Sequence, residues 1–275
     1  MSELLATGFY RLVRGRHGLF LSNPKDIYIG RAVIEYGEFS ELEAQLLLKL
    51  IPTGGVVIEA GANMGALTVP LAKKAGPRGL VYAFEPQPLI FQQLCANLAL
   101  NDLVNVSAIN AGCGSEPGSI GIARLNPSRE ANFGGVPLDR ITVENNAVRV
   151  RIERLDDVVD PQRLDLIKAD VEGMELVVLQ GADSLISRFR PALYVENHED
   201  GSEELITHVT NLGYECWWHL PPLFNPRNHA GKAENVYKGI VSCNMLCIPT
   251  ERKANFEGFR RVSGPTDHPK RWKSA

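Results

Sequence analysis

The sequence predicts an α/β fold with a doubly wound, mostly parallel sheet, and three observations lead to this prediction. From residue 56 onward, short apolar runs with strand character alternate with longer segments of helical periodicity. Acidic residues stand at the ends of several apolar runs, where ligands bind in sheets of this kind. A glycine-spaced turn follows the first run, as expected where a strand leads into a helix around a ligand.

The alternation places each element in turn. Strands are expected at residues 56–58, 80–84, 104–109, 164–169 and 192–196. Helices are expected at residues 65–75, 87–100, 172–181 and 202–212. Two later apolar runs are expected to form edge strands that close the sheet, at residues 236–240 and 244–248.

An N-terminal cap of residues 1–52 is expected before the alternation begins. Residues 9–13 and 18–21 have strand character and are joined by turn-forming residues, which predicts a hairpin. Ser40 and Glu43 have the spacing of a capping box at the start of a leucine-striped helix that stops before Pro52.

The main α/β domain is expected to span residues 53–250, with a basic tail at 251–275. The segment 123–147 is rich in Asn, Pro, Arg and Gly and is too long for an ordinary connection. We expect it at the ligand face as a substrate-contacting loop, with disorder as the alternative. The tail is expected to be a solvated, partly frayed terminus, with capture of an anionic substrate or a subunit contact as alternatives.

Composition excludes some classes of protein. With 275 residues the chain is long enough for a large core, and its net charge of −3 gives no electrostatic case for a nucleic-acid partner. No stretch approaches the roughly 18 apolar residues of a membrane-spanning helix. An odd number of cysteines without a CxxC pair fits a reducing compartment. We therefore expect a cytoplasmic protein without a membrane span.

The turn after the first strand favours a cationic, nucleotide-like ligand. Gly61 and Gly65 allow a tight turn, but Asn63 stands where a dinucleotide-binding fingerprint needs its second glycine. Glu59, just before the turn, would repel a pyrophosphate. The same carboxylate would attract S-adenosylmethionine, which carries an ammonium and a sulfonium and no phosphate. A plain strand-to-helix turn is the structural alternative.

The second strand supports this interpretation, because it ends in Glu85. A carboxylate at this position can accept hydrogen bonds from both hydroxyls of a ribose. Together with the turn, it extends the candidate ligand site over two strand ends.

The most specific segment, residues 165–182, combines a strand that ends in acids with an immediate helix start. Here the sequence resembles the FkbM family of S-adenosylmethionine-dependent methyltransferases. The matching parts lie between about residues 36 and 200, at positions 59–65, 84–86, 132–135, 170–175, 179, 181–182 and 195–196. One departure is Glu59, because the family more often has Asp there; the charge is retained.

The resemblance implies a Rossmann-like class I methyltransferase that uses S-adenosyl-L-methionine. It also implies methylation of hydroxyl oxygens on sugars, polyketides and other secondary metabolites. The partner would be a small hydroxyl-bearing molecule, and a homo-oligomer is left open. The expected cofactor-binding residues are Glu59, Gly61, Asn63, Met64, Gly65, Glu85, Gly112 and Cys113.

An alcohol is a poor nucleophile at neutral pH, so its proton must be removed by a base or its pKa lowered by a metal. Asp170 ends the fourth strand, and Glu196 and Asn197 end the fifth. Neighbouring strands lie about 5 Å apart, so these oxygen ligands could share a magnesium ion. By position, this set resembles the ligands of catechol-type O-methyltransferases. The alternative is that Asp170 and Glu172 only cap the helix near 173.

The candidate bases are His198 and Glu172, with a slight preference for the histidine because it titrates near neutrality. Asp170, Glu172 and His198 thus form the expected catalytic set. Two other classes of protein remain as alternatives: a nicotinamide-dependent oxidoreductase, which the missing fingerprint glycines disfavour, and a non-catalytic nucleotide-binding protein, which would not need the acids at 170, 172 and 196.

Overall fold

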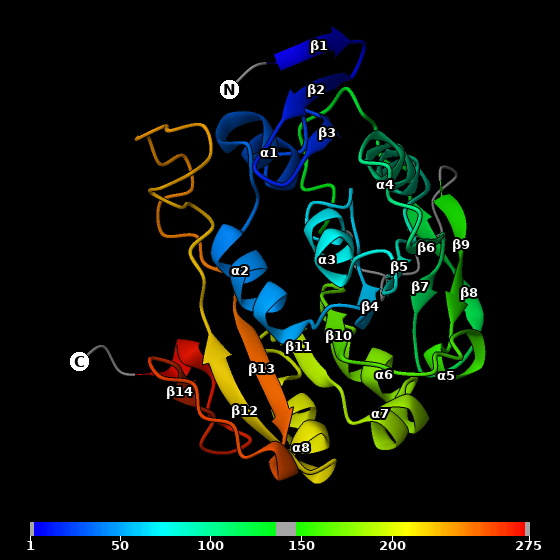
Figure 1. Cartoon of the computed structure of the whole chain (residues 1–275), viewed down its shortest axis with the longest axis vertical. Coiled ribbons are helices and arrows are strands. Elements are labelled where there is room, and N and C mark those ends of the chain that lie inside the picture. Colours follow the sequence, from blue (N-terminus) through cyan, green and yellow to red (C-terminus); the bar gives the residue numbers. More distant parts are fainter. Residues whose placement is uncertain (1–2, 136–146, 273–275) are drawn as a thin grey trace.

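The computed structural model describes residues 3–135 and 147–272, and a mixed sheet of eight strands runs through its centre (Figure 1). In spatial order the strands are β14 (Arg260–Arg261), β12 (Tyr214–His219), β13 (Asn244–Pro249), β11 (Ala192–Glu196), β10 (Leu166–Ala169), β4 (Val56–Ala60), β5 (Leu80–Phe84) and β6 (Val106–Ile109).

Strands β11, β10, β4, β5 and β6 are parallel, while β13, β12 and β14 continue the sheet in antiparallel pairs. The chain winds from β4 toward β6 and then crosses to β10, on the other side of β4. The strand order therefore reverses between β4 and β10, which leaves a crevice at their carboxyl ends. The prediction of a doubly wound, mostly parallel sheet is confirmed.

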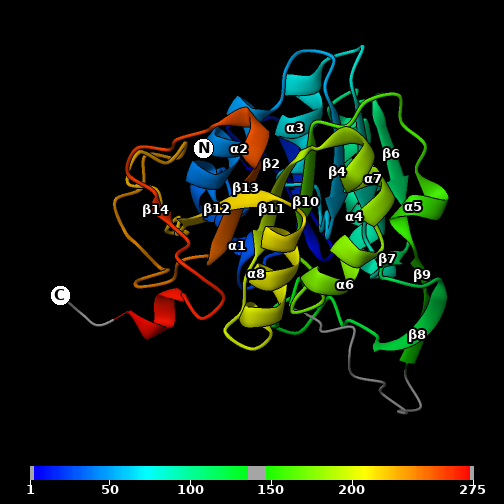
Figure 2. The same cartoon turned by 90° about the horizontal axis from the view of Figure 1, so that it is seen from below.

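Helices cover both faces of the sheet (Figures 1 and 2). One layer contains α2 (Glu41–Leu50), α3 (Thr68–Ala75) and α4 (Pro88–Leu100), and the other contains α5 (Leu155–Val158), α6 (Glu175–Gln180), α7 (Asp183–Phe189) and α8 (Ser202–Asn211). Among residues 3–135 and 147–272, no helix has the length and apolar character needed to cross a membrane.

Alternating side chains of the strands serve the two helix layers. Val57 packs in one core with Leu47 of α2 and Leu71 of α3, while its neighbour Ile58 packs in the other core with Ile206 of α8. Each of these side chains is almost completely buried. Burial of strands on both faces explains why they are continuous apolar runs in the sequence rather than alternating ones.

The expected edge strand at residues 236–240 is not formed. This segment is a turn, and Tyr237 packs instead against Tyr36 and Leu223. Strand β13 pairs antiparallel with β11 on one side and with β12 on the other, and Trp217 and Trp218 of β12 are buried in the two different cores. Two large aromatic side chains on opposite faces make β12 a better sheet strand than residues 236–240.

The N-terminal part has three strands, one more than the predicted hairpin: β1 (Glu3–Thr7), β2 (Tyr10–Arg14) and β3 (Leu19–Ser22), followed by α1 (Ile29–Tyr36). The predicted capping box of α2 is wrong. Ser40 has a left-handed backbone, with φ 42°, and its side chain makes no capping bond to the backbone. Instead, Ser40 Oγ donates to Glu43 Oε2 at 2.8 Å.

A small separate sheet flanks the crevice, with strand order β7 (Gly112–Cys113), β9 (Ala147–Glu153) and β8 (Gly118–Ala123). The predicted loop 123–147 connects β8 to β9, and its residues 136–146 lie outside the described part of the chain. Ala131 is joined to the N-terminal part by two backbone hydrogen bonds of 3.1 Å, with Ile27 and Lys25. The start of this loop is therefore held over the crevice.

The sequence predicts a tail that is solvated and partly frayed, and residues 260–272 are largely exposed but not frayed. Strand β14 pairs with β12, and Asp267 accepts hydrogen bonds from Ser263 N at 2.9 Å and Trp272 Nε1 at 2.7 Å. The guanidinium of Arg260 lies 3.9 Å from the centre of the Trp272 ring. Aromatic packing and charge pairing thus hold this basic segment against the sheet.

Candidate active site

A continuous cleft opens at the carboxyl ends of β4, β5, β10 and β11. It consists of two adjoining cavities that share the residues Gly61, Glu85, Gly134, Asp170 and Glu172. The sheet places the cleft where its strand order reverses, as is usual for ligand sites in open α/β sheets.

The turn after β4 leaves no room for a side chain at Gly61. Its φ is +83°, and a Cβ there would lie 1.9 Å from the carbonyl oxygen of Asp170. The N–H groups of Gly61 and Ala62 both donate to Phe84 O, at 3.0 and 2.9 Å. Only glycine at position 61 allows the end of β4 to approach the end of β10, at Asp170, this closely.

Glu85 lies at the junction of the two cavities and is tied to the backbone on both sides. Its Oε2 accepts from Asn63 N at 2.9 Å and its Oε1 from Gln87 N at 2.8 Å. Each oxygen keeps a further lone pair for a ligand hydroxyl. Burial raises the pKa of Glu85 to about 7.

A buried lysine balances the acids at the base of the cleft. Lys168, on β10, is 2% exposed, and its Nζ lies 3.1 Å from Asp170 Oδ2. Glu59 accepts from Thr68 Oγ1 at 2.7 Å, and burial raises the pKa of Glu59 and of Glu43 to about 7. Burial lowers the pKa of Lys168, but the charges of the three neighbouring acids outweigh it and raise that pKa above its ordinary value.

Sequence reasoning missed Lys168, although a signal was present. It is the single charged residue within β10, and an ionised side chain is rarely buried without a partner. Its partner Asp170 is two residues away and so projects from the same face of the strand. A lysine two positions before an acid at the end of a buried strand therefore indicates a buried ion pair.

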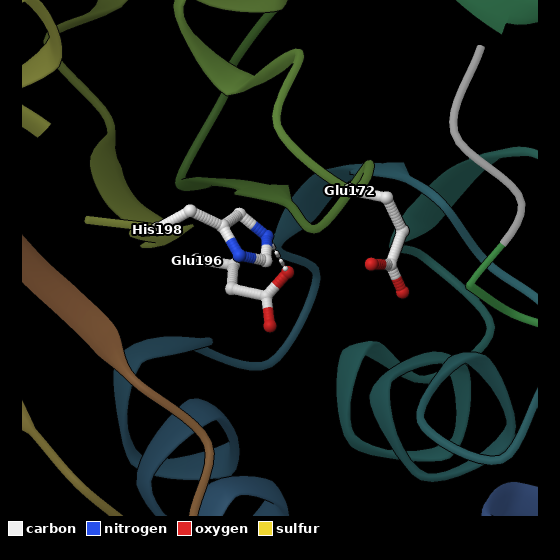
Figure 3. A group of neighbouring side chains, drawn as sticks. All are labelled: Glu172, Glu196 and His198. Atoms are coloured by element: carbon white, nitrogen blue, oxygen red, sulfur yellow. Dashed lines mark hydrogen bonds and ion pairs between the residues drawn. The ribbon is translucent and has the colours of Figure 1, made fainter. Parts of the chain in front are cut away.

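Glu172, Glu196 and His198 form a second group of charges, at the rim of the cleft (Figure 3). His198 Nε2 lies 2.9 Å from Glu196 Oε2, and Glu172 faces this pair from the turn after β10. The hydrogen bond that His198 donates to Glu196 raises the pKa of His198, while burial and the charge of Asp170 raise the pKa of Glu196. Burial raises the pKa of Glu172 to about 7.

Of the expected magnesium ligands, Asp170 and Glu196 lie next to each other at the ends of β10 and β11, where their side chains interact and line the cleft, but Asn197 points away from them. The carboxylate of Asp170 is paired with Lys168, and the buried amide nitrogen of Asn197 donates to Met245 Sδ at 3.3 Å. Among the described residues, the group with metal-ligand spacing is instead Glu172, Glu196 and His198, whose ligand atoms lie within 4.8 Å of one another.

The capping alternative for Asp170 and Glu172 is wrong. Helix α6 begins at Glu175, and it is Glu175 whose Oε1 accepts from Val171 N at 2.9 Å and Gly173 N at 3.2 Å. Asp170 and Glu172 line the cleft. Glu172 has a φ of +57°, a left-handed conformation that is rare for glutamate.

The expected cofactor-binding residues divide into two groups. Six line the cleft: Glu59, Gly61, Asn63, Glu85, Gly112 and Cys113. Met64 and Gly65 line neither cavity. The Met64 sulfur accepts from Gln93 Nε2 at 3.6 Å inside the core, and Gly65 sits close to the side chain of Leu94.

One wall of the cleft is apolar and comes from distant parts of the chain. The N-terminal part and the segment before β13 contribute it, through Tyr28, Ile29, Phe39, Leu223, Ile240 and Val241. The tyrosine hydroxyl of Tyr237 donates to Tyr28 O at 2.9 Å and joins the two segments. The sequence prediction placed the loop 123–147 at the substrate face and missed the contribution of α1 and its flanks.

Residues 59–216, more than half of the chain, match the sequence profile of the methyltransferase FkbM domain. This protein belongs to the FkbM methyltransferase family. Methyltransferase sdnD of Sordaria araneosa is 31% identical over 191 residues, which cover 54% of this chain and 73% of that protein. Methyltransferase 1 of Beauveria bassiana (strain ARSEF 2860) is 28% identical over 151 residues, covering 48% of this chain and 60% of the relative.

Among solved structures, the crystal structure of methyltransferase FkbM from Methylobacillus flagellatus KT superposes with a TM-score of 0.47 and 18% sequence identity. The superposition covers 70% of this chain and 44% of that chain. In the 275-residue protein described above, the region that matches the family profile begins at Glu59 and ends at Cys216. The apolar wall, by contrast, is formed by residues outside it.

Proposed function

We propose that this FkbM methyltransferase transfers a methyl group from S-adenosylmethionine to a hydroxyl oxygen of a small molecule. The observation that carries the proposal is the division of the cleft. One side presents backbone turns with Glu59 and Glu85, and the other presents an apolar wall beside Glu172 and Glu196. A nucleotide-like cofactor fits the first side and an acceptor the second.

The chemistry of the lining supports this cofactor. Gly112, Cys113 and Ile122 border the narrower cavity and would hold the adenine, while Glu85 would bind the ribose hydroxyls. Glu59 and the turn at Gly61 and Asn63 would hold the methionine part. These acids suit the positive charges of S-adenosylmethionine, whereas the pyrophosphate of a nicotinamide cofactor would meet several carboxylates. When bound, S-adenosylmethionine supplies the methyl group and a neutral thioether leaving group.

The Glu196–His198 pair is the proposed acceptor for the proton of the hydroxyl group. Glu196 lines the cleft, and His198 Nε2 lies 2.9 Å from its Oε2. Glu172 lies within 4.8 Å of this pair, burial raises its pKa to about 7, and it is a second group able to take the proton. Asp170 has a different part, because its carboxylate is the partner of Lys168. The remaining contribution is positioning of the two reactants in a preformed cleft.

The proposed acceptor is a small, partly apolar alcohol. Phe39, Leu223 and Ile240 offer apolar contact, and Glu172 and Glu196 lie beside them. Carboxylates can accept hydrogen bonds from the hydroxyl groups of such a molecule, but they would repel phosphorylated or carboxylated acceptors.

An acceptor screen tests the proposal. The protein is incubated with methyl-labelled S-adenosylmethionine and matched pairs of small molecules that differ in carrying a hydroxyl or an amine at the same position. We expect label in methyl ethers of the hydroxyl compounds, identified by mass spectrometry. Methylation of nitrogen or carbon alone would overturn the assignment to oxygen. Stabilisation by NAD and not by S-adenosylmethionine in a thermal shift assay would overturn the cofactor.

A further inference from the structure

A buried histidine from the C-terminal segment lies directly behind the end of β11. His268 is 1% exposed, and its ring packs edge-on against Trp218 with the centroids 5.5 Å apart. It lies 52 residues beyond the region that matches the family profile, which ends at residue 216. The segment that carries it is held to β12, where Trp218 Nε1 donates to Asp267 Oδ2 at 3.4 Å and the Trp218 ring packs edge-on against Trp272.

Hydrogen bonding assigns the tautomer of this histidine. His268 Nδ1 accepts a bond from Lys270 N at 3.2 Å, so the proton of a neutral ring is on Nε2. Nε2 lies 3.3 Å from Asn197 O and 3.7 Å from Cys243 Sγ. Burial lowers the pKa of His268, which favours the neutral ring. His268 therefore donates to the main chain of Asn197.

The peptide groups of Asn197 are consequently held on both sides. Its N–H donates to Cys243 O at 2.8 Å, and its carbonyl accepts from His268. Asn197 stands between Glu196 and His198, whose side chains bond to each other at 2.9 Å. Residues two apart in an extended chain project to the same side, so the orientation of both side chains depends on the peptides between them.

We propose that His268 is a positioning residue for methyl transfer, which holds Glu196 and His198 in contact through its Nε2–H bond to Asn197 O. The inference rests on the proposed role of this pair as proton acceptor. Glu196 and His198 lie within the region that matches the family profile, whereas His268, which holds them in place, lies in the C-terminal segment. A group held within a fraction of an ångström is needed for efficient proton transfer.

Several charged groups surround His268 and His198, and a test of the proposal must leave all of these charges unchanged. Glu199, Lys270 and Arg271 act on His268, while Asp170, Glu172, Glu175 and Glu196 act on His198. A variant should therefore change a hydrogen bond without changing any of these charges. Glutamine places an N–H near the position of Nε2, whereas asparagine reaches only the position of Nδ1.

The experiment is an NMR titration of the 275-residue protein labelled at histidine, in wild type, His268→Gln and His268→Asn. We expect the pKa of His198 to fall in His268→Asn by about one unit toward its ordinary value, because contact with Glu196 loosens. His268→Gln should keep most of the wild-type value. An unchanged pKa of His198 in His268→Asn would overturn the proposal, as would an equal fall in both variants.

A measurement on the wild type covers the case in which the variants do not fold. Nitrogen chemical shifts report which ring nitrogen carries the proton, and we expect His268 to be neutral with the proton on Nε2 at pH 7. A proton on Nδ1, or a charged ring, would overturn the inference. Calorimetry with S-adenosylmethionine is run separately: absence of binding would contradict the proposed function without altering these titrations.

Discussion

Lys168 Nζ lies 3.1 Å from Asp170 Oδ2 at the base of the cleft, on the strand where the order of the sheet reverses. The lysine is buried, and Glu43 and Glu59 contribute to its charge environment. The chain itself therefore supplies a cation next to Asp170, where sequence reasoning expected a magnesium ion. This pair gives Asp170 a role in organising the cleft.

Replacement of the lysine tests this role. Lys168→Met leaves Glu43, Glu59 and Asp170 without a counter-charge, and we expect a loss of roughly 3 kcal/mol in the free energy of unfolding at pH 8. Burial raises the pKa of Glu43 and Glu59 from the ordinary 4.5 to about 7 in the folded protein. Their contribution to the free energy of unfolding is therefore fully present below pH 4.5 and is lost as the pH rises through 7, where both become buried charges. The deficit should be smaller at pH 6.

Urea denaturation at both pH values measures this effect. Lys74→Met is the matched control, because Lys74 is exposed on α3 and should change stability by no more than about 0.5 kcal/mol. A Lys168→Met protein as stable as the control at pH 8 would show that the acids do not depend on the lysine.

The second prediction concerns the ribose site. Glu85→Ala should weaken binding of S-adenosylmethionine by roughly 1–3 kcal/mol, because charge-assisted hydrogen bonds are lost and the N–H of Asn63 loses its acceptor. Isothermal titration calorimetry measures the affinity. Glu116→Ala, on an exposed turn, is the control and should bind as the wild type does. Equal affinity of the two variants would remove Glu85 from the site.

The third prediction is proton-linked binding. Burial raises the pKa of Glu59, Glu85 and Glu172 to about 7, so these groups are partly protonated near neutrality. A cationic ligand favours their ionised forms, and binding should therefore release protons and tighten from pH 6 to pH 8. Calorimetry in buffers of different ionisation enthalpy counts the protons. Proton uptake, or an affinity that does not change with pH, would contradict the assignment of a cationic cofactor to these acids.

The fourth prediction concerns metal. Because Asp170 is paired with Lys168 and the Asn197 side chain faces Met245, we expect affinity for S-adenosylmethionine to be the same with added magnesium and after chelation. A loss of affinity on chelation would contradict this. Glu172→Gln and His198→Ala would then show whether the metal depends on the Glu172, Glu196 and His198 group.

The fifth prediction concerns the proton acceptor. With an acceptor identified by the screen, His198→Ala should lower the rate of methyl transfer by roughly 10²- to 10⁴-fold with little change in cofactor affinity. His229→Ala, which removes an exposed ring, should leave the rate unchanged. If Glu172→Gln is impaired and His198→Ala is fully active, Glu172 is the base and the role proposed for the Glu196–His198 pair is wrong.

Local sequence patterns determined most of the α/β core. The runs that became β4, β5, β10 and β11 were recognisable because strands buried on both faces are short and continuously apolar. The acids at the ends of these strands could then be predicted to lie near one another, because parallel strands end at the same edge of the sheet. The family resemblance rested on the same segments, and the family profile matches this region.

Tertiary structure decided what depends on contacts between distant residues. Pairing of β13 with β12 rather than with residues 236–240, the ion pair environment of Lys168 and the wall built by Phe39 and Leu223 all join segments far apart in the chain. Likewise, Met64 turned into the core and Asn197 toward Met245. The sequence by itself specified which residues end each strand, because periodicity records burial along the chain. Only packing of the whole chain set which of them face one another across the cleft, because that depends on the direction of each side chain and on its partners.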